Sequence, residues 1–123
     1  MNTKSLDQEY AAYAWKCVQK NSTREYKNLA KSIPALVMSN GLMQTLAFLK
    51  AKGKQEHNDL AAHICGWIFG KNSSPVNGRV FCDNFQKIME QLAALSSYEY
   101  RMKTEESLAV LRWMRQLSDA AIE

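Results

Sequence analysis

Hydrophobic residues recur at intervals of three and four along most of this chain, the spacing that places them on one face of an α-helix. In the first such segment the apolar positions are Leu6, Tyr10, Tyr13, Ala14 and Cys17. We find no segment with a convincing strand pattern. The pattern therefore predicts an all-α fold, a compact bundle of about six helices that forms a single domain over residues 1–123.

The second predicted helix has an apolar side and a cationic side. Its apolar side carries Tyr26, Leu29, Ile33, Leu36 and Val37. Its opposite side carries Arg24, Lys27 and Lys31. Because these two lysines lie opposite the predicted core, we expect their joint replacement by glutamate to leave the fold intact.

Capping and turn residues predict the ends of this helix and the next. Ser22 and Glu25 have the spacing of a capping box at the start of the second helix. Asn40–Gly41 ends it, because glycine adopts the left-handed conformation of a C-terminal cap. A third helix follows from Leu42 to Lys52, and its apolar positions spread around most of its surface, which predicts that it is buried between neighbours.

The fourth helix is expected to begin near Asn58–Asp59, since both residue types favour N-caps, and to end at Gly70. Residues 71–78 are rich in Pro, Gly, Asn and Ser, which is typical of a surface loop. A fifth helix follows, with Asp83 as its N-cap.

A second capping box, Ser96 with Glu99, opens the last helix. This helix either continues to Ile122 or breaks near Thr104, where Glu105 and Glu106 would suit a new first turn; the pattern leaves both open. If it is continuous, Val110, Trp113, Met114, Leu117 and Ala121 form its core side. Its outer side then carries Arg101, Leu108, Leu111, Arg112 and Arg115.

That outer side is a candidate subunit interface, because leucines among arginines suit contact with a partner or with a copy of the same chain. The alternative is that isolated exposed leucines are normal on protein surfaces. Gln44, which points away from the leucine side of the third helix, is a further candidate for contact with RNA or a neighbouring subunit. A buried amide bonded to the backbone is the commoner environment for such a residue.

Positive charge is concentrated in one third of the chain. The formal net charge is +4. Eight basic residues lie between positions 16 and 54 against the single acid Glu25, and they are Lys16, Lys20, Arg24, Lys27, Lys31, Lys50, Lys52 and Lys54. This asymmetry favours a polyanionic partner such as a nucleic acid, so these eight are the candidate residues for binding it; a merely solvated charged face is the alternative.

Catalytic and metal chemistry find little support in the sequence. The three cysteines, Cys17, Cys65 and Cys82, include no C-x-x-C pair, which argues against a disulfide framework or a zinc knuckle, and the first two are expected to be small buried hydrophobes. His57 and His63 are six residues apart and so lie on different sides of a helix. We therefore predict no catalytic residues, no metal, no cofactor and no enzymatic activity.

No apolar run approaches the roughly twenty residues that a membrane span needs. The N-terminal sequence MNTKSLDQEY resembles neither a signal peptide nor a transit peptide. The expected location is the cytoplasm, without a membrane partner.

Several motifs together resemble the small helical subunit of the Cmr-type (type III-B) CRISPR ribonucleoprotein effector complex. The central ones are Tyr26-Lys27, Leu29-Ala30-Lys31, Pro34-Ala35-Leu36, Ser39-Asn40-Gly41-Leu42 and Gln44-Thr45-Leu46-Ala47-Phe48-Leu49. Flanking ones are Tyr13-Ala14-Trp15, Cys17-Val18, Tyr100-Arg101 through Thr104, and Leu108 to Leu117 around Trp113. The resemblance covers most of the chain and is least diagnostic from Gly70 to Ala94.

The resemblance implies a non-catalytic subunit that acts in antiviral defence. Sequence specificity would come from base pairing between guide RNA and target RNA, and the small subunit would line the duplex channel through backbone contacts. The resemblance also implies that several copies stack in a filament against the backbone and large subunits. Its motifs include the basic positions Lys27, Lys31 and Lys50; the other five follow from charge alone.

Two other classes of function remain open at this stage. A helix-turn-helix DNA-binding protein could use the Asn40–Gly41 turn, but the helix that would enter the groove, Leu42 to Lys52, is mostly apolar. A structural adaptor could use its basic face to bind an acidic protein.

Overall fold

The computed structural model describes residues 5–70 and 76–123, and these residues form helices and no strands. The helices are α1 Leu6–Lys20, α2 Arg24–Asn40, α3 Leu42–Lys52, α4 Gln55–Gly70, α5 Gly78–Asp83, α6 Phe85–Ala93 and α7 Ser97–Ala121. The all-α prediction is confirmed. The described residues hold seven helices rather than about six, because the short helix α5 forms ahead of the expected fifth helix, which corresponds to α6.

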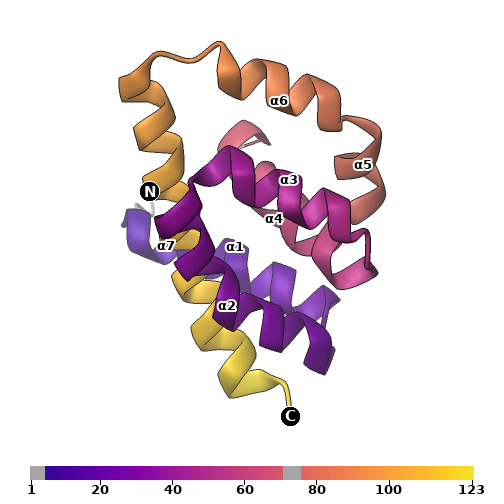
Figure 1. Cartoon of the computed structure of the whole chain (residues 1–123). Helices are drawn as coiled ribbons and strands as arrows, with labels where there is room; N and C mark the ends of the chain where they lie inside the picture. The colour runs from indigo at the N-terminus through magenta and orange to yellow at the C-terminus, as the bar shows by residue number, and fades with distance from the viewer. Residues whose placement is uncertain (1–4, 71–75) are drawn as a thin grey trace.

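The helices pack around α4, which contacts α2, α3, α5 and α7. Every residue of α4 from Leu60 to Ile68 is buried, so this helix meets neighbours on all sides. Figure 1 shows α6 crossing the upper end of the molecule and joining α7, which descends past α2 to the C-terminus at the lower end. The buried apolar residues form one cluster to which all seven helices contribute.

The predicted core sides of the first two helices are mostly correct. Tyr10, Tyr13, Ala14 and Cys17 of α1 are buried. In α2 the buried set includes Tyr26, Leu29, Ile33 and Val37, and Leu36 is partly buried. Helical periodicity identified these faces because α1 and α2 each have one side turned to the core.

The prediction that α3 is buried all round is wrong. Leu42, Leu46 and Leu49 are fully buried, but Phe48 is 39% exposed and Ala47 is also exposed. The reason is that α3 packs on α2 and α4 from one side, with α6 at its edge, and its remaining side faces solvent. The central buried helix is instead α4.

The corner between α2 and α3 depends on glycine, as the sequence predicts, but Gly41 does not adopt the predicted left-handed helical conformation. Gly41 has φ +91° and ψ 164°, a region that residues with a Cβ rarely adopt. Its amide donates to Val37 O at 2.9 Å and so closes α2. The next helix is tied to α7, because the Met43 amide donates to the Tyr100 hydroxyl at 2.9 Å.

The N-terminal cap of α2 is Thr23 and not Ser22. The Thr23 side chain accepts from the Tyr26 amide at 3.1 Å. Ser22 instead donates to Val18 O at 3.1 Å, because the chain is still leaving α1 at that point. The capping box expected from Ser22 and Glu25 is therefore not formed.

Two further helix starts differ from the prediction. α4 begins at Gln55, one turn before the expected Asn58–Asp59. Asp59 lies within the helix, and its carboxylate accepts from the Gly78 amide at 3.0 Å, so that it holds the start of α5.

Asp83 ends α5, and the cap position of α6 is occupied by Asn84 instead. Of the loop expected at residues 71–78, residues 71–75 lie outside the described residues and Gly78 begins α5. The last helix does not break: α7 passes through Thr104 as one helix, opened by the predicted capping box of Ser96 and Glu99.

Candidate nucleic-acid interface

The cationic side of α2 is present, but its lysines have different environments. The Lys27 ammonium donates to Ile122 O at 2.8 Å and lies 3.9 Å from Asp119 Oδ1, and its side chain is only 19% exposed. Lys31, one turn further along, lies 3.3 Å from Asp119 Oδ1 and is 46% exposed. Lys27 therefore contacts the end of α7 and is not free on the side opposite the core, so we now expect its replacement to affect the fold.

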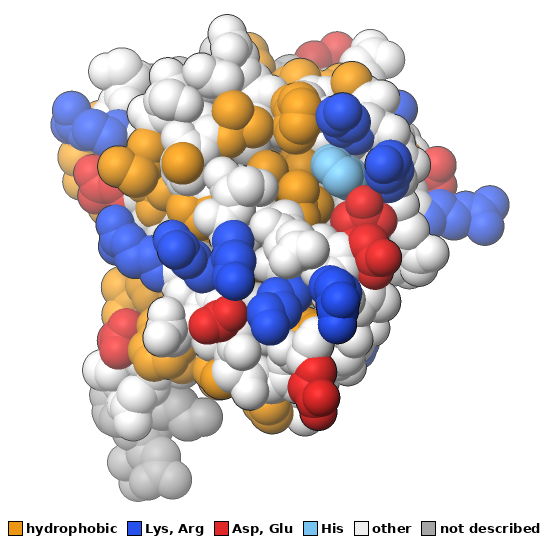
Figure 2. All heavy atoms as spheres, turned by 60° about the horizontal axis from the view of Figure 1, so that its bottom comes forward, with side chains coloured by type: hydrophobic (Ala, Val, Ile, Leu, Met, Phe, Trp, Pro, Cys, Tyr) orange, Lys and Arg blue, Asp and Glu red, His pale blue; other side chains and the backbone are white. Residues whose placement is uncertain are grey.

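Lys31 faces two arginines of α7 across a hollow of about 500 Å³. We call this the α2–α7 groove, and its lining residues are Lys31, Arg112, Arg115, Gln116 and Asp119. Figure 2 shows Lys and Arg side chains in a band across this part of the surface, with an acidic side chain beside them. The structure thus joins a residue predicted to bind RNA with two residues predicted to contact a subunit.

A second cationic surface lies at the end of α3. The Lys52 ammonium lies 5.7 Å from the centre of the Phe48 ring, and that ring is 6.2 Å from the His57 ring. Lys50 lies 5.8 Å above the Phe85 ring of α6. Sequence reasoning missed the aromatic part of this surface, although Phe48 is four residues before Lys52, a spacing that places both on one helix side.

Lys16 and Lys20, the two residues of α1 predicted to bind RNA, belong to neither of these cationic surfaces. Lys16 and Lys20 are both exposed. Lys20 lines a hollow at the start of α2 together with Glu25, Glu56 and Asp59. These carboxylates offset its charge, so Lys20 is a weaker candidate for phosphate contact than Lys31.

The predicted outer side of α7 needs correction. Leu111 is completely buried, and Leu108 is partly buried against the core cluster. α7 packs against α1, α2 and α4, so more than one side of this helix is covered and the leucines belong to the core. Arg101 is exposed on the same helix, 5.9 Å from the Tyr98 ring.

Gln44 is exposed on α3. The commoner environment for such an amide, burial against the backbone, is therefore not the one it has. It stays available for an external partner.

The two histidines do not form a site. His63 is 2% exposed, and its Nδ1 lies 2.8 Å from the Tyr26 hydroxyl. Burial lowers the pKa of His63 to about 4, with the Lys20 ammonium as a second cause. His57 is partly buried near the Phe48 ring, and its Nδ1 lies 3.1 Å from Glu56 Oε2. In the described ranges no three His, Cys, Asp or Glu side chains are placed to hold a metal ion.

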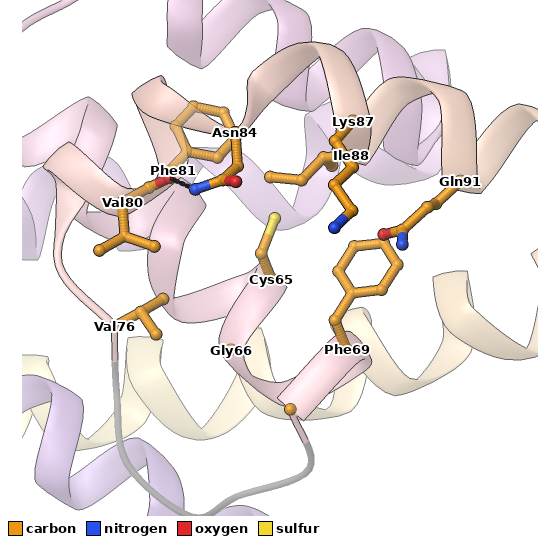
Figure 3. A pocket seen from close by; sticks show the side chains of 11 residues that line it. Cys65, Gly66, Phe69, Val76, Val80, Phe81, Asn84, Lys87, Ile88 and Gln91 are labelled. Carbon is orange, nitrogen blue, oxygen red and sulfur yellow. Dashed lines mark hydrogen bonds between the residues drawn. The ribbon is translucent and has the colours of Figure 1, made fainter.

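Cys17 and Cys65 are buried, as predicted, and burial raises the pKa of each thiol to about 12. Cys65 points into an apolar hollow of about 320 Å³ between α4, α5 and α6. Figure 3 shows the Phe69 ring and the Val80 side chain around this hollow, with the Lys87 ammonium near its edge. Its apolar lining does not suit phosphate, so we exclude it from the candidate interface.

Among the residues with described coordinates, no helix combines the length and hydropathy of a membrane span.

Comparison with known proteins agrees with the sequence resemblance. Residues 6–121 match the family model described as "CRISPR-associated protein (Cas_Cmr5)". The CRISPR system Cmr subunit Cmr5 of Thermus thermophilus is 29% identical over 103 residues, which cover 80% of this chain and 76% of that protein.

The fold is also similar to a solved structure. The X-ray crystal structure of a CRISPR-associated Cmr5 family protein from Thermus thermophilus matches with a TM-score of 0.73 at 23% identity, over 98% of this chain and 100% of that one. The resemblance stated from the sequence is confirmed by the family match, which spans nearly the whole chain. This chain belongs to the Cmr5 family of CRISPR-associated proteins.

Proposed function

We propose that this protein is the non-catalytic small subunit of a type III-B (Cmr) CRISPR effector complex. In this proposal it contacts the sugar-phosphate backbone of the guide RNA–target RNA duplex. Membership of the Cmr5 family supports the assignment to the complex. The Thermus relative is itself named as a Cmr subunit. In this proposal the protein acts in antiviral defence in the cytoplasm.

One observation supports the RNA contact: the α2–α7 groove is lined by three cationic side chains from two helices, Lys31, Arg112 and Arg115. Guanidinium groups can donate two parallel hydrogen bonds to phosphate oxygens, and an ammonium acts as a point charge. Such contacts fix the position of a backbone and read no bases. This suits a complex in which base pairing with the guide supplies the specificity.

The end of α3 is a second contact in this proposal. The ammonium groups of Lys50 and Lys52 lie 5.8 and 5.7 Å from the centres of aromatic rings. Lys54 follows at an exposed position after α3. Contact at both the groove and α3 would spread the binding energy over several phosphates, and the affinity would then fall steeply with salt.

Other Cmr subunits and further copies of this chain are the proposed protein partners. Exposed apolar side chains suit such contacts better than the buried Leu111. Trp15 on α1 is 43% exposed and Met38 near the end of α2 is 73% exposed. We propose that a filament of copies uses surfaces of this kind and leaves the α2–α7 groove open to RNA.

The assignment to a complex is tested by gentle purification of the tagged protein from its own cells, followed by mass spectrometry and RNA sequencing. We expect other Cmr-type subunits and short RNAs of discrete length. Recovery of the protein alone, or with DNA, would contradict the proposal.

The position of the contact is tested by two matched charge reversals, Arg112→Glu in the groove and Arg79→Glu on α5. Arg79 is 90% exposed, and Figure 1 places α5 well away from the C-terminal half of α7. Both changes alter the net charge equally, so a general electrostatic effect would weaken RNA binding equally. We expect Arg112→Glu to weaken the binding of an RNA duplex several-fold more than Arg79→Glu does. Equal weakening would refute the groove as the contact, and tighter binding to an acidic protein than to RNA would favour an adaptor.

A further inference from the structure

We propose that the α2–α7 groove is a binding subsite for one phosphodiester group and that Asp119 is its built-in competitor, a carboxylate that the phosphate displaces from Lys31. The inference rests on the proposed function and adds to it a defined position for one phosphate and a residue that limits affinity there.

The ion pair that closes the groove is weak and accessible. Asp119 Oδ1 lies 3.3 Å from the Lys31 ammonium, and the two side chains are 54% and 46% exposed. Exposed pairs of this kind contribute only about 0–1 kcal/mol in water. A phosphodiester carries the same single negative charge as the carboxylate, so it can replace Asp119 as the partner of Lys31 without leaving the lysine unpaired.

The rest of the groove is complementary to an anion. Arg112, Gln116 and Asp119 are spaced so that they share one side of α7. Arg115 lies three residues after Arg112 and lines the same hollow. Among the described residues, the ion pairs within 4.0 Å include neither arginine. Both guanidinium groups therefore have donors free for phosphate oxygens in the groove.

Asp119 can release Lys31 while the end of α7 stays in place. The Lys27 ammonium donates to Ile122 O at 2.8 Å, and Ile122 itself is 6% exposed. Two contacts of Ile122, both independent of Lys31, thus hold the end of the chain that follows Asp119. Displacement moves the exposed Asp119 side chain away from Lys31 and does not involve the hydrogen bond between Lys27 and Ile122 O.

The test measures the affinity of the full chain for a fluorescent RNA duplex of about 20 base pairs, by anisotropy, over a series of KCl concentrations. Asp119→Asn removes the competitor. Asp83→Asn is the matched control, since Asp83 is a 71% exposed carboxylate that pairs with Arg79 on α5. Both variants gain one unit of positive charge.

We expect Asp119→Asn to bind about two- to five-fold more tightly than Asp83→Asn, the ratio that corresponds to an exposed ion pair. Its affinity should also depend more steeply on salt, by about one counterion. When Lys31 is already replaced by Gln, the further change Asp119→Asn should give no such gain over Lys31→Gln alone. Equal affinity of Asp119→Asn and Asp83→Asn, or a gain that persists without Lys31, would overturn the inference.

A second measurement separates this inference from the proposed function. Dimethyl phosphate is a phosphodiester without bases, and its binding to wild-type protein and to Asp119→Asn can be followed by NMR of the lysine and arginine side chains. Shifts at Lys31 and Arg112 that grow in Asp119→Asn, without any binding of the RNA duplex, would retain the subsite and refute the RNA function. RNA binding with no such shifts would retain the function and refute the subsite. Binding of polyglutamate as tightly as RNA would also refute it, in favour of an acidic protein.

Discussion

Lowering the pH from 7 to 5 should destabilise this protein through one buried side chain, His63. Burial, with Lys20 as the second cause, lowers its pKa to about 4 from an ordinary value of 6.5. Between these two values the unfolded chain binds a proton at this position and the folded chain does not. The free energy of unfolding therefore falls as the pH falls through this interval.

Hydrogen bonds around the ring explain why the folded protein keeps His63 neutral. The Asn21 amide nitrogen lies 3.3 Å from Nε2 and also donates to Cys17 O. An amide NH₂ group only donates, so Nε2 must accept and carries no proton. Nδ1 then donates to the Tyr26 hydroxyl at 2.8 Å, which in turn donates to the Met114 sulfur. A proton on Nε2 would face the Asn21 donor and disrupt this chain.

The magnitude follows from the two pKa values. A shift from 6.5 to about 4 corresponds to about 3 kcal/mol if the pH falls below both values. At pH 5 the expected loss relative to pH 7 is about 2 kcal/mol, because the unfolded chain is then almost fully protonated at this position and the folded chain is hardly protonated at all. That is a large fraction of the stability of a small domain.

Urea unfolding at pH 7, 6 and 5 measures this loss. His57→Gln is the matched control, because His57 is the other histidine of the chain and its ring contacts Glu56 rather than the hydrogen-bonded groups around His63. It should lose stability as the wild type does, whereas His63→Gln should lose about 2 kcal/mol less over the same range. Burial raises the pKa of Asp59, which acts in the opposite direction, and the comparison of variants cancels its effect. An equal change in stability of the wild type and His63→Gln from pH 7 to 5, or an NMR titration of the His63 ring near pH 6.5, would refute the reasoning.

Three further predictions concern packing and backbone geometry. Gly41→Ala should lower the free energy of unfolding by about 1–3 kcal/mol in urea, because its φ of +91° is strained for alanine; an unchanged value would show that the corner relaxes. Gly66→Ala should cost about 2 kcal/mol or more, because its Cβ would collide with the buried Tyr13 hydroxyl, and near-UV circular dichroism should report the displaced ring. Lys27→Met should destabilise by about 1–2 kcal/mol and Lys31→Met by under about 0.5 kcal/mol, since only the first loses a hydrogen bond to backbone; equal effects in thermal melts would contradict this difference.

The sequence predicts the helical class and the core faces of α1 and α2 because helical periodicity is a local property. Tyr13 and Tyr26 are both among the largest fully buried side chains, as their positions in the pattern suggest. Local patterns also identify the turn at Gly41, whose positive φ the structure confirms. They fail where several helices cover one element. Leu111 lies opposite the expected core side of α7, yet it is buried, because α1, α2 and α4 approach this helix from different directions.

Helix starts were less predictable because neighbouring residues compete for the same role. Ser22 and Thr23 both have hydroxyl groups suited to capping, and only the path of the chain out of α1 decides that Thr23 caps α2. Asp59 has a suitable carboxylate too, but it accepts from Gly78, nineteen residues later in the sequence. A local pattern contains no information about such a distant partner.

Local patterns also fail to predict the contacts of the candidate interface, and this failure affects how the RNA contact should be tested. Counting charges places Lys27 and Lys31 in one group, because they lie one turn apart on the same side of α2. The two lysines nevertheless have different contacts at the end of α7. Lys27 donates to the Ile122 carbonyl, whereas Lys31 lines the groove together with Arg112. A joint charge reversal at both lysines would disturb the fold and the surface together, and a loss of RNA binding could then arise from either. Changes at Lys31 and Arg112 alter the groove without removing the contact that holds α7, so they isolate the electrostatics of binding from the stability of the fold.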